Sequence, residues 1–341
     1  MRAVVITKHG PPDVLQVHER PDPEPGAGEV LIEVRAAGVN FADLLARTGL
    51  YQDAPKPPCV VGYEVAGVVE RVGEGVESPA VGDRVMAGCR FGGYSELVVT
   101  AADSVFPLPD DWGFTEGAAF PVAYGTAYAA LVRYGALREG ERVLIQAAAG
   151  GVGIAATQVA KQVGAGAIYG TASPGKHEAI RSFGVDHPID YTGGDVAAKV
   201  RAVAGEDEPL DLVMDAIGGR SFKESFSLLR PGGRLVCFGA SAVGGGDKRN
   251  LLKAVRTVVA MPRFKPVPLM TDSKGVIGLN MLRLWDAKGS LDEFVGPLQD
   301  WAESGAIRPA LSEGIFRFDD APDAHRYIQE RKNVGKVVLV P

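Results

Sequence analysis

The sequence predicts a protein of the α/β fold class, in which a doubly wound parallel sheet is joined to a smaller, mostly-β domain. Two observations carry this prediction. Residues 141–153 run from a short apolar strand through a turn of alanine and glycine into a helix, the layout of a dinucleotide-binding corner. Beyond about Phe114, helical patterns alternate with short buried strands, whereas the preceding residues suggest many short strands with glycine and proline turns.

Length and composition exclude several classes of protein. The chain has 341 residues, enough for two domains with a large buried core. Its formal net charge of −6 argues against a non-specific nucleic-acid binder, and no apolar run is long enough to span a bilayer. The first residues lack the layout of a signal peptide. Three widely spaced cysteines predict neither a disulfide framework nor a zinc cluster, so we expect a reducing, cytoplasmic setting.

The chain up to about residue 122 is predicted to be mostly β. Polar Glu33 and Arg35 alternate with apolar neighbours, as in a half-exposed strand, and Asn40 follows as a helix cap. Short strands separated by glycine and proline turns favour a compact barrel-like domain. The expected elements are strands at 3–7, 14–18, 30–39, 64–70, 83–87 and 92–99, and a helix at 41–47.

The following part is predicted to form a parallel sheet with helices between its strands. Ligands of such sheets bind outside the carboxyl ends of the strands, so loops 216–219 and 239–241 are expected to line a site. Residues 243–275 show no clear period, and we expect a mobile or partner-contacting loop there. The expected elements are strands at 143–145, 167–170, 187–190, 211–215 and 234–239, helices at 154–163 and 176–183, and a turn at 231–233 between helix and strand.

The tail from about Ser290 is expected to return to the first domain and to end in a strand at 335–340. The predicted bounds are therefore residues 1–122 with 286–341 for the mostly-β domain, and 123–285 for the dinucleotide-binding domain.

The turn after the strand at 143–145 is the expected phosphate site. Gly150 would let the backbone approach a pyrophosphate, and Gly153 would let the helix pack on the strand, with Gly151 and Val152 between them. Ala148 stands where the G-x-G-x-x-G pattern has its first glycine, so the match is partial. The alternative is a tight turn that binds no ligand.

The end of the second strand of the parallel sheet indicates which nicotinamide cofactor would bind. NAD sites usually place an acid there to bind the ribose hydroxyls. This chain has Ser173 and Lys176 and no acid, and a hydroxyl with an ammonium would attract the 2′-phosphate of NADP(H). NADPH is therefore favoured over NADH. The alternative for Lys176 is a solvated residue in the first turn of a helix.

Motifs of one known family run through the whole chain in order. On these motifs the chain resembles the medium-chain dehydrogenase/reductase superfamily and, within it, the zinc-independent quinone oxidoreductases. It is most similar to the vesicle amine transport protein-like branch, and it also resembles the enoyl reductase domains of polyketide synthases. The resemblance implies a GroES-like substrate domain and a Rossmann domain for NADP(H). The motifs lie at 37–43, 49–51, 62–67, 81–85, 147–153, 170–173, 176–179, 187–191, 229–233, 248–251 and 332–336.

The ligands that hold zinc in related enzymes are missing from the matching positions. Asn40 stands near the position of the catalytic cysteine, and Tyr63 precedes Glu64 where a histidine would be. The region after Cys89 lacks the loop of four cysteines that would hold a second zinc. Because zinc requires thiolate and imidazole ligands, no metal is predicted.

The resemblance implies roles for residues of both domains. Asn40 and Thr126 would lie near the nicotinamide, with Phe238, Gly239 and Ser241 flanking it. The adenosine ribose and its 2′-phosphate would contact Ser173, Lys176 and Tyr191. Thr171 would also bind the cofactor, and Asn333 and Lys336 would close over it. Each has a structural alternative: a packing residue for Tyr191, a turn former for Asn333, and a helix cap or turn residue for Thr126 and Asn40.

The expected reaction is hydride transfer from NADPH to a quinone or to the β-carbon of an enone. Tyr51 is the first candidate for a residue that orients the substrate or donates a proton, although its phenol has a structural alternative and water could supply the proton. Two other functions stay open: an enoyl-thioester reductase, or an NADPH-binding protein that acts through partners or a membrane surface. The resemblance also implies a homodimer. A basic run bears on the membrane alternative, although a solvated loop is the favoured interpretation: Lys248, Arg249, Lys253, Arg256, Arg263 and Lys265.

Overall fold

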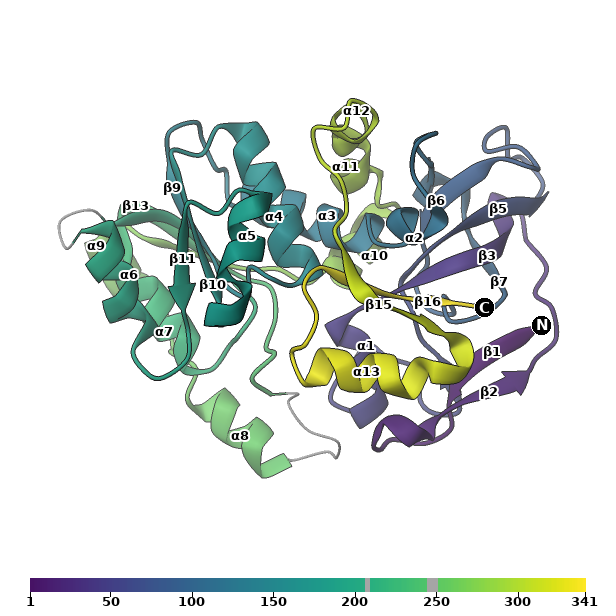
Figure 1. Ribbon diagram of the computed structural model, residues 1–341, viewed down its shortest axis with the longest axis horizontal. Helices are drawn as coiled ribbons and strands as arrows, with labels where there is room; N and C mark the ends of the chain where they lie inside the picture. Colours follow the sequence, from purple (N-terminus) through teal and green to yellow (C-terminus); the bar gives the residue numbers. More distant parts are fainter. Residues whose placement is uncertain (206–208, 244–250) are drawn as a thin grey trace. The chain divides into compact units, whose positions relative to one another are not determined.

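The computed structural model describes residues 1–205, 209–243 and 251–341, and these form two compact units (Figure 1). The first unit contains Met1–Gly125 and Leu282–Pro341, and the second contains the described residues of 126–243 and 251–281. Each unit has its own cluster of buried apolar side chains.

The first unit is built on a seven-stranded sheet in the order β15-β16-β3-β5-β6-β8, with β7 pairing with β3. The long strand β3 is central because it pairs antiparallel with β5, β7 and the last strand, β16. A three-stranded sheet has the order β2-β1-β4. The strands are β1 (Arg2–Ile6), β2 (Leu15–Glu19), β3 (Glu29–Val39), β4 (Cys59–Val60), β5 (Glu64–Val72), β6 (Arg84–Gly88), β7 (Leu97–Ala101), β8 (Val105–Pro107), β15 (Leu311–Arg317) and β16 (Lys336–Val340).

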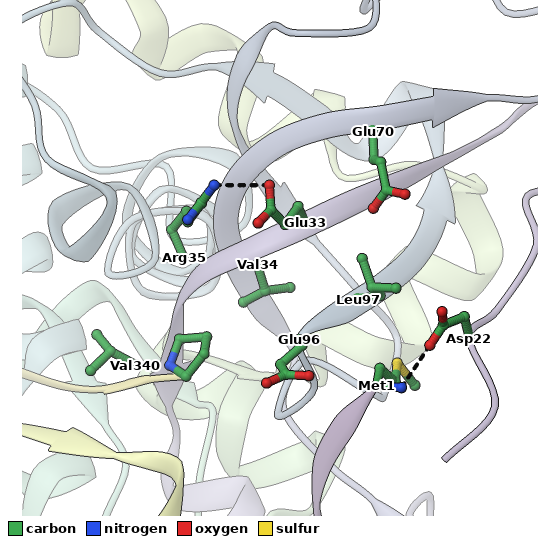
Figure 2. A pocket seen from close by; sticks show the side chains of 10 residues that line it. Met1, Asp22, Glu33, Val34, Arg35, Glu70, Glu96, Leu97 and Val340 are labelled. Carbon is green, nitrogen blue, oxygen red and sulfur yellow. Dashed lines mark hydrogen bonds and ion pairs between the residues drawn. The ribbon is translucent and has the colours of Figure 1, made fainter. Parts of the chain in front are cut away.

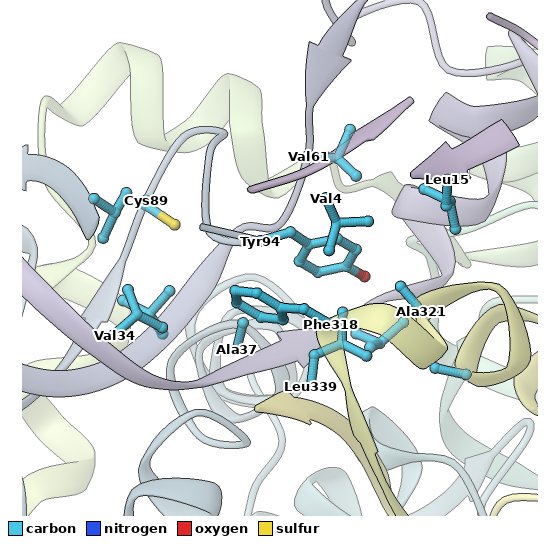
Figure 3. Close-up of a cluster of buried hydrophobic side chains, with 14 of the residues drawn as sticks. Val4, Leu15, Val34, Ala37, Val61, Cys89, Tyr94, Phe318, Ala321 and Leu339 are labelled. Carbon is cyan, nitrogen blue, oxygen red and sulfur yellow. The ribbon is translucent and has the colours of Figure 1, made fainter. Parts of the chain in front are cut away.

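The core of the first unit contains side chains from both sheets and from the C-terminal part of the chain. Figure 3 shows Val4 of β1 and Leu339 of β16 in one cluster with Tyr94 and Phe318. Strands β1 and β16 are buried on both faces, because residues 3–6 and 336–339 are all at most 5% exposed. The helices of this unit include α1 (Phe41–Thr48), α2 (Phe114–Gly117), α11 (Asp292–Val295), α12 (Gln299–Glu303) and α13 (Ala321–Gln329).

The second unit is built on a six-stranded sheet in the order β11-β10-β9-β12-β13-β14, and every pair of neighbouring strands is parallel. The predicted parallel sheet is thus confirmed. The order reverses between β9 and β12, which makes the carboxyl ends of these two strands the switch point where such sheets bind ligands. The strands are β9 (Arg142–Ile145), β10 (Ala167–Ala172), β11 (His187–Asp190), β12 (Leu210–Asp215), β13 (Leu229–Cys237) and β14 (Gly275–Gly278).

Helices connect the parallel strands, as the alternating pattern predicts. Helix α7 packs on β12 and β13, and α5 packs on β10 and β11. Among the described residues, no helix combines the length and the apolar character that crossing a membrane requires. The helices are α4 (Gly151–Val163), α5 (His177–Phe183), α6 (Val196–Ala204), α7 (Arg220–Ser227), α8 (Leu251–Val259) and α9 (Pro266–Asp272); α3 (Pro121–Tyr128) and α10 (Met281–Lys288) each span a unit boundary.

Two of the predicted elements are wrong in part. The strand expected at 92–99 begins only at Leu97, because Gly92 adopts a φ of 90° and Gly93 donates its N–H to the carbonyl of Gly62. The turn expected at 231–233 lies inside β13, where the pairing with β12 shifts its register. That irregularity accommodates Gly232 at a φ of 83°.

The loop expected at 243–275 is also wrong over most of its length. It contains helices α8 and α9, and β14 begins at its end; residues 244–250 lie outside the described residues. The apolar residues of α8 recur at helical spacing, and they face solvent: Leu252, Val255, Val258 and Val259 are 56% to 77% exposed.

Candidate functional site

The turn between β9 and α4 has the geometry of an anion-binding site. Gly150 is the N-cap of α4, a helix of 13 residues. A Cβ on Gly153 would lie 2.4 Å from the carbonyl oxygen of Ala147 and 2.6 Å from Cα of Ala148, so only glycine fits there. The N–H groups of Gly151, Val152 and Gly153 belong to the first turn, where helix N–H groups lack partners within the helix and attract phosphate.

This turn differs from the expected one in the packing of Gly153. Gly153 packs against the turn itself rather than against the strand. Ala147, next to the position of the pattern's first glycine, takes the left-handed conformation, with a φ of 56°. At Gly150 a Cβ would meet only the Ala147 carbonyl oxygen, at 3.5 Å, so packing does not require glycine there. Its role in the approach of a pyrophosphate stays a prediction.

Three predicted ribose-binding residues lie together at the carboxyl ends of β10 and β11. Ser173 follows β10 directly, and its carbonyl accepts the backbone N–H of Lys176 at 2.9 Å. The backbone N–H of Tyr191 lies 3.4 Å from the carbonyl of Ala172, which brings the end of β11 beside Ser173. The side chains of all three are half-buried.

The acid nearest to this group is already engaged. Asp190 ends β11 and accepts the hydroxyl of Thr192 at 2.6 Å, its backbone N–H at 2.7 Å, and the ammonium of Lys199 at 3.3 Å. The hydrogen bond from the Thr192 side chain is the main reason that the pKa of Asp190 is lowered. This carboxylate is therefore held by its own loop and is not directed at Ser173 or Lys176 by any of these contacts.

Thr171 lies beneath the turn and is 2% exposed. Its hydroxyl accepts the backbone N–H of Ala147 at 2.9 Å and donates to the side-chain oxygen of Gln146 at 2.8 Å. The Thr171 hydroxyl therefore already has two hydrogen-bond partners, and a contact with a cofactor would compete with its bond to the Ala147 N–H in the turn.

The residues predicted to flank the nicotinamide follow β13 and lie beside the end of β12. Phe238 donates its backbone N–H to the carbonyl of Asp215 at 3.1 Å, and Ser241 donates to that of Ala216 at 2.9 Å. A Cβ on Gly239 would lie 3.0 Å from the carbonyl oxygen of Ala216, so this segment lies tightly against the end of β12. Thr126 is buried in α3.

In the first unit, three adjacent strands bring Lys336, Asn40 and Glu64 together. Lys336 begins β16, Asn40 follows β3, and Glu64 begins β5. The Lys336 ammonium donates to the Asn40 amide oxygen at 2.6 Å and to the Glu64 carboxylate; the Asn40 amide nitrogen donates to the same carboxylate at 3.0 Å. Their exposed fractions are 5%, 9% and 0%, so the ion pair is shielded from water. The other Glu64 oxygen accepts the N–H of Val122 at 2.8 Å.

Asn40 is the N-cap of α1, as predicted, but its amide serves the cluster rather than the helix. The backbone N–H of Asn40 donates to the Asp43 carboxylate at 2.7 Å. Asp43 also accepts the hydroxyl of Tyr94 at 2.9 Å, and that hydroxyl lies 3.4 Å from Nε2 of His325. Burial raises the pKa of Asp43 to about 7 and lowers that of His325 well below its usual range. Asp43 thus connects Asn40 to a second buried polar group.

Tyr51 lies at the edge of an aromatic group. Its ring meets that of Tyr63 edge to face at 6.3 Å between centroids, and Tyr63 lies 5.3 Å from Phe91. Burial raises the pKa of Tyr51 to about 12, so its phenol stays protonated at neutral pH. The Tyr63 hydroxyl is buried and has no hydrogen-bond partner within the described part of the chain. Asn333 donates its amide to the carbonyl of Gly335 at 3.0 Å, consistent with the turn-forming alternative.

A separate pocket of about 570 Å³ in the first unit contains none of the predicted site residues (Figure 2). Four carboxylates line it, and two of its cationic groups are paired: Arg35 with Glu33, and the Met1 amine with Asp22. Its lining would repel a phosphorylated cofactor. It is therefore no candidate for the dinucleotide site.

Several residues of these clusters were not singled out as site residues from the sequence. Glu64, Asp43, Gln146 and Asp215 are all buried and hydrogen-bonded beside predicted site residues. In the sequence these residues are marked only by their positions: a polar residue at the end of an apolar strand, or one three residues after a helix cap. That signal is weak because solvated residues commonly occupy the same positions.

Two family models match parts of the chain. A model of the alcohol dehydrogenase GroES-like domain matches residues 26–110, and a model of the zinc-binding dehydrogenase family matches residues 183–339. Zinc does not fit the donors present, because the Glu64 carboxylate contacts an ammonium and an amide rather than lying among thiolates and imidazoles. Across the described residues, no three or more His, Cys, Asp or Glu side chains are grouped to hold a metal ion.

The chain is similar to proteins of known name along its full length. The synaptic vesicle membrane protein VAT-1 homolog of Danio rerio is 38% identical over 99% of this chain and 69% of its own. The quinone oxidoreductase of Escherichia coli, solved with NADPH, is 29% identical with a TM-score of 0.86 over 100% of both chains. The CurK enoyl reductase is 28% identical with a TM-score of 0.85 over 99% of this chain and 98% of its own.

Proposed function

The chain belongs to the medium-chain dehydrogenase/reductase superfamily, in the VAT-1-like branch of its zinc-independent quinone oxidoreductases, and from this we propose the reaction that it catalyses. It is an oxidoreductase with a Rossmann-type domain and a GroES-like domain. The proposed reaction is hydride transfer from NADPH to a quinone or to the β-carbon of an α,β-unsaturated carbonyl compound. The Rossmann-type unit would bind the cofactor, and the GroES-like unit would bind the substrate.

The observation that carries this proposal is the pairing of two features in the second unit. The N-terminus of α4 offers unpaired N–H groups for a pyrophosphate. At the end of β10, Ser173 and Lys176 stand where NAD-binding proteins place an acid, and Asp190 is held by Thr192 and Lys199. A hydroxyl and an ammonium favour the 2′-phosphate, which supports NADPH as the donor.

The nicotinamide ring supplies the hydride when the cofactor is bound. Reduction of a quinone or enone leaves an anion that needs hydrogen-bond donors and then a proton. Tyr51 carries a phenol that is half-buried and protonated, so it is the proposed group for orienting the substrate or for donating this proton. The Asn40 amide and the Lys336 ammonium hold each other in a buried cluster, and we propose that the cofactor is bound beside this cluster.

A substrate panel tests the reaction. Purified protein with NADPH is assayed against quinones, small enones and enoyl thioesters, and we expect oxidation of NADPH with quinones or enones. Turnover of enoyl thioesters alone would instead favour the alternative of a biosynthetic enoyl reductase, and no turnover with any acceptor would contradict the proposal. Tyr51→Phe is expected to lower kcat, whereas full turnover in that variant would exclude a Tyr51 proton from the mechanism.

Assembly and location belong to the same proposal. Strand β14 pairs only with β13 in the described sheet, and its free edge could pair with the β14 of a second copy. We therefore propose a homodimer, which light scattering on the purified protein would detect. All three cysteines are free, which supports a reducing, cytoplasmic location.

One observation favours the alternative of an NADPH-binding protein that acts at a membrane surface. The outer face of α8 exposes Leu252, Val255, Val258 and Val259, and exposed Arg256, Arg263 and Lys265 lie on or near it. Lys248 and Arg249 of the predicted basic run lie outside the described residues. An apolar face with basic neighbours is typical of helices that lie on anionic lipid surfaces.

Liposome sedimentation tests this alternative. Binding to vesicles of phosphatidylserine and phosphatidylcholine, lost in high salt and in a Val255→Glu Val258→Glu double variant, would support it. Equal recovery in the supernatant with anionic and neutral vesicles would exclude it. A Val81→Glu Val203→Glu double variant adds the same two charges at exposed valines outside α8 and serves as the matched charge control.

A further inference from the structure

A line of buried hydrogen bonds crosses the carboxyl ends of β10, β9 and β12. The Thr171 hydroxyl donates to the Gln146 side-chain oxygen at 2.8 Å, and the Gln146 amide donates to the Ser225 hydroxyl at 3.4 Å. The Ser225 hydroxyl then donates to the Asp215 carboxylate at 2.7 Å. The exposed fractions of these four residues are between 0% and 5%. All the bonds are oriented toward Asp215, as in a polarised chain of donors.

One end of this line holds a strained residue. Thr171 also accepts the backbone N–H of Ala147, at 2.9 Å, and Ala147 has a φ of 56°. A left-handed alanine costs about 1–2 kcal/mol and persists only where its surroundings fix it. The carbonyl of Ala147 is the group against which Gly153 packs. Through Ala147, the Thr171 hydroxyl therefore sets where α4 begins.

The other end organises the loop on the far side of the switch point. The Asp215 carboxylate accepts the hydroxyl of Ser221 at 2.7 Å, besides that of Ser225, and the backbone N–H groups of Ile217 at 2.7 Å and Gly218 at 3.4 Å. The line thus joins the turn after β9 to the loop after β12, the two segments at the point where strand order reverses.

We propose that Thr171, Gln146, Ser225 and Asp215 are positioning residues that fix the pyrophosphate-binding turn. This inference rests on the proposed nucleotide site. The four residues hold the N–H groups of α4 in place through Ala147 and do not touch the 2′-phosphate. Loss of the Thr171 hydroxyl consequently weakens ligands that contain a pyrophosphate and leaves the binding of adenosine 2′-phosphate unchanged.

The test compares Thr171→Val, which removes the hydroxyl at nearly constant shape, with Thr171→Ser, which keeps it. Calorimetric titrations use NADPH and 2′-AMP, which lacks the pyrophosphate. Thr171→Val is expected to raise the Kd for NADPH by about tenfold, which corresponds to about 1.4 kcal/mol, while the Kd for 2′-AMP changes less than about twofold. Thr171→Ser is expected to restore NADPH binding to within about threefold of wild type.

Ser225→Ala, at the opposite end, gives an independent readout if Thr171→Val does not fold. It is expected to weaken NADPH by a smaller factor and again to spare 2′-AMP. In the double variant the losses should be less than additive, because either change interrupts the same line. Equal weakening of both ligands, or an unchanged Kd for NADPH in both variants, would overturn the positioning role. A wild-type protein that binds neither ligand would instead overturn the proposed function, and this inference with it.

Discussion

The ammonium of Lys336 lies 2.6 Å from the amide oxygen of Asn40, and both groups contact the same buried carboxylate, that of Glu64. The contact depends on the pairing of β16 with β3, in which Val337 lies opposite Val39. Residues almost 300 positions apart are therefore joined in one charged cluster by sheet register. A buried charge is tolerated only when its partner and its hydrogen bonds are in place.

Removal of the Lys336 ammonium should destabilise the protein strongly. Lys336→Met leaves the Glu64 carboxylate buried and unpaired, and the free energy of unfolding in urea is expected to fall by about 3–5 kcal/mol. Adding Glu64→Gln should recover part of the loss because the unpaired charge is gone. Arg35→Met is the control: it breaks an ion pair with Glu33 in which both side chains are about half exposed, and should cost at most about 1 kcal/mol. A loss as small as the control's would contradict the account.

Asp43 should make the stability of the protein depend on pH. Its folded-state pKa of about 7 lies above the usual 3.8, so its contribution is fully present below pH 4 and is lost as the pH rises through 7. Asp43→Asn stays neutral throughout. Relative to this variant, the wild type is expected to lose about 4 kcal/mol of stability between pH 4 and pH 8.

Unfolding in urea at several pH values measures this difference. His325 is present in both proteins. Because burial lowers its pKa, it makes both less stable as the pH falls below 6.5, and this loss cancels in the comparison. The charges that face Asp43 also remain unchanged, Lys336 among them. A difference in stability that is constant with pH would show that Asp43 is ionised at the same pH in the folded and unfolded chain.

Gly153→Ala should disrupt the nucleotide site. The added Cβ would meet backbone atoms of Ala147 and Ala148 at 2.4–2.6 Å, so α4 must shift away from the turn. We expect a loss of about 1–3 kcal/mol in stability and at least about a tenfold loss in NADPH affinity. Gly278→Ala is the matched control, since nothing lies within 4 Å of its added Cβ. If Gly153→Ala bound NADPH with wild-type affinity, the N-terminus of α4 would not be the anion-binding site.

Lys176→Ala should change the choice between cofactors. If the ammonium contacts the 2′-phosphate, the Michaelis constant for NADPH is expected to rise about tenfold and that for NADH less than about twofold. Lys223→Ala removes an exposed lysine from α7 and should alter neither value. An equal rise for both cofactors would mean that Lys176 does not discriminate between them.

Local sequence patterns predicted much of the second unit correctly. Strands β9, β10 and β12 are short apolar runs, and their identity depends on residues next to one another. The close approach of other backbone atoms to Gly153 was predicted correctly, because a glycine at that position of the motif leaves room for them. The atoms that approach it belong to the turn and not to the strand. The prediction of a loop failed at α8, although Leu252, Val255 and Val259 stand at helical spacing in the sequence.

The polar clusters could not be predicted in the same way. The Lys336–Glu64 pair depends on which strands are neighbours and in what register, which no local pattern specifies. Thr171 was predicted to bind the cofactor, and its position in the sequence gave no indication that its hydroxyl contacts Ala147 and Gln146. A single sequence shows that a polar residue is present at the end of a strand; it does not show which neighbour receives its hydrogen bond.

The preference between the two nicotinamide dinucleotides tests the central claim most directly. Purified wild-type protein is titrated with NADPH and with NADH under the same salt and pH, and the two values of Kd are compared. The site at Ser173 and Lys176 predicts that NADPH binds at least about tenfold more tightly, a difference of about 1.4 kcal/mol. Equal affinities, or tighter binding of NADH, would contradict it.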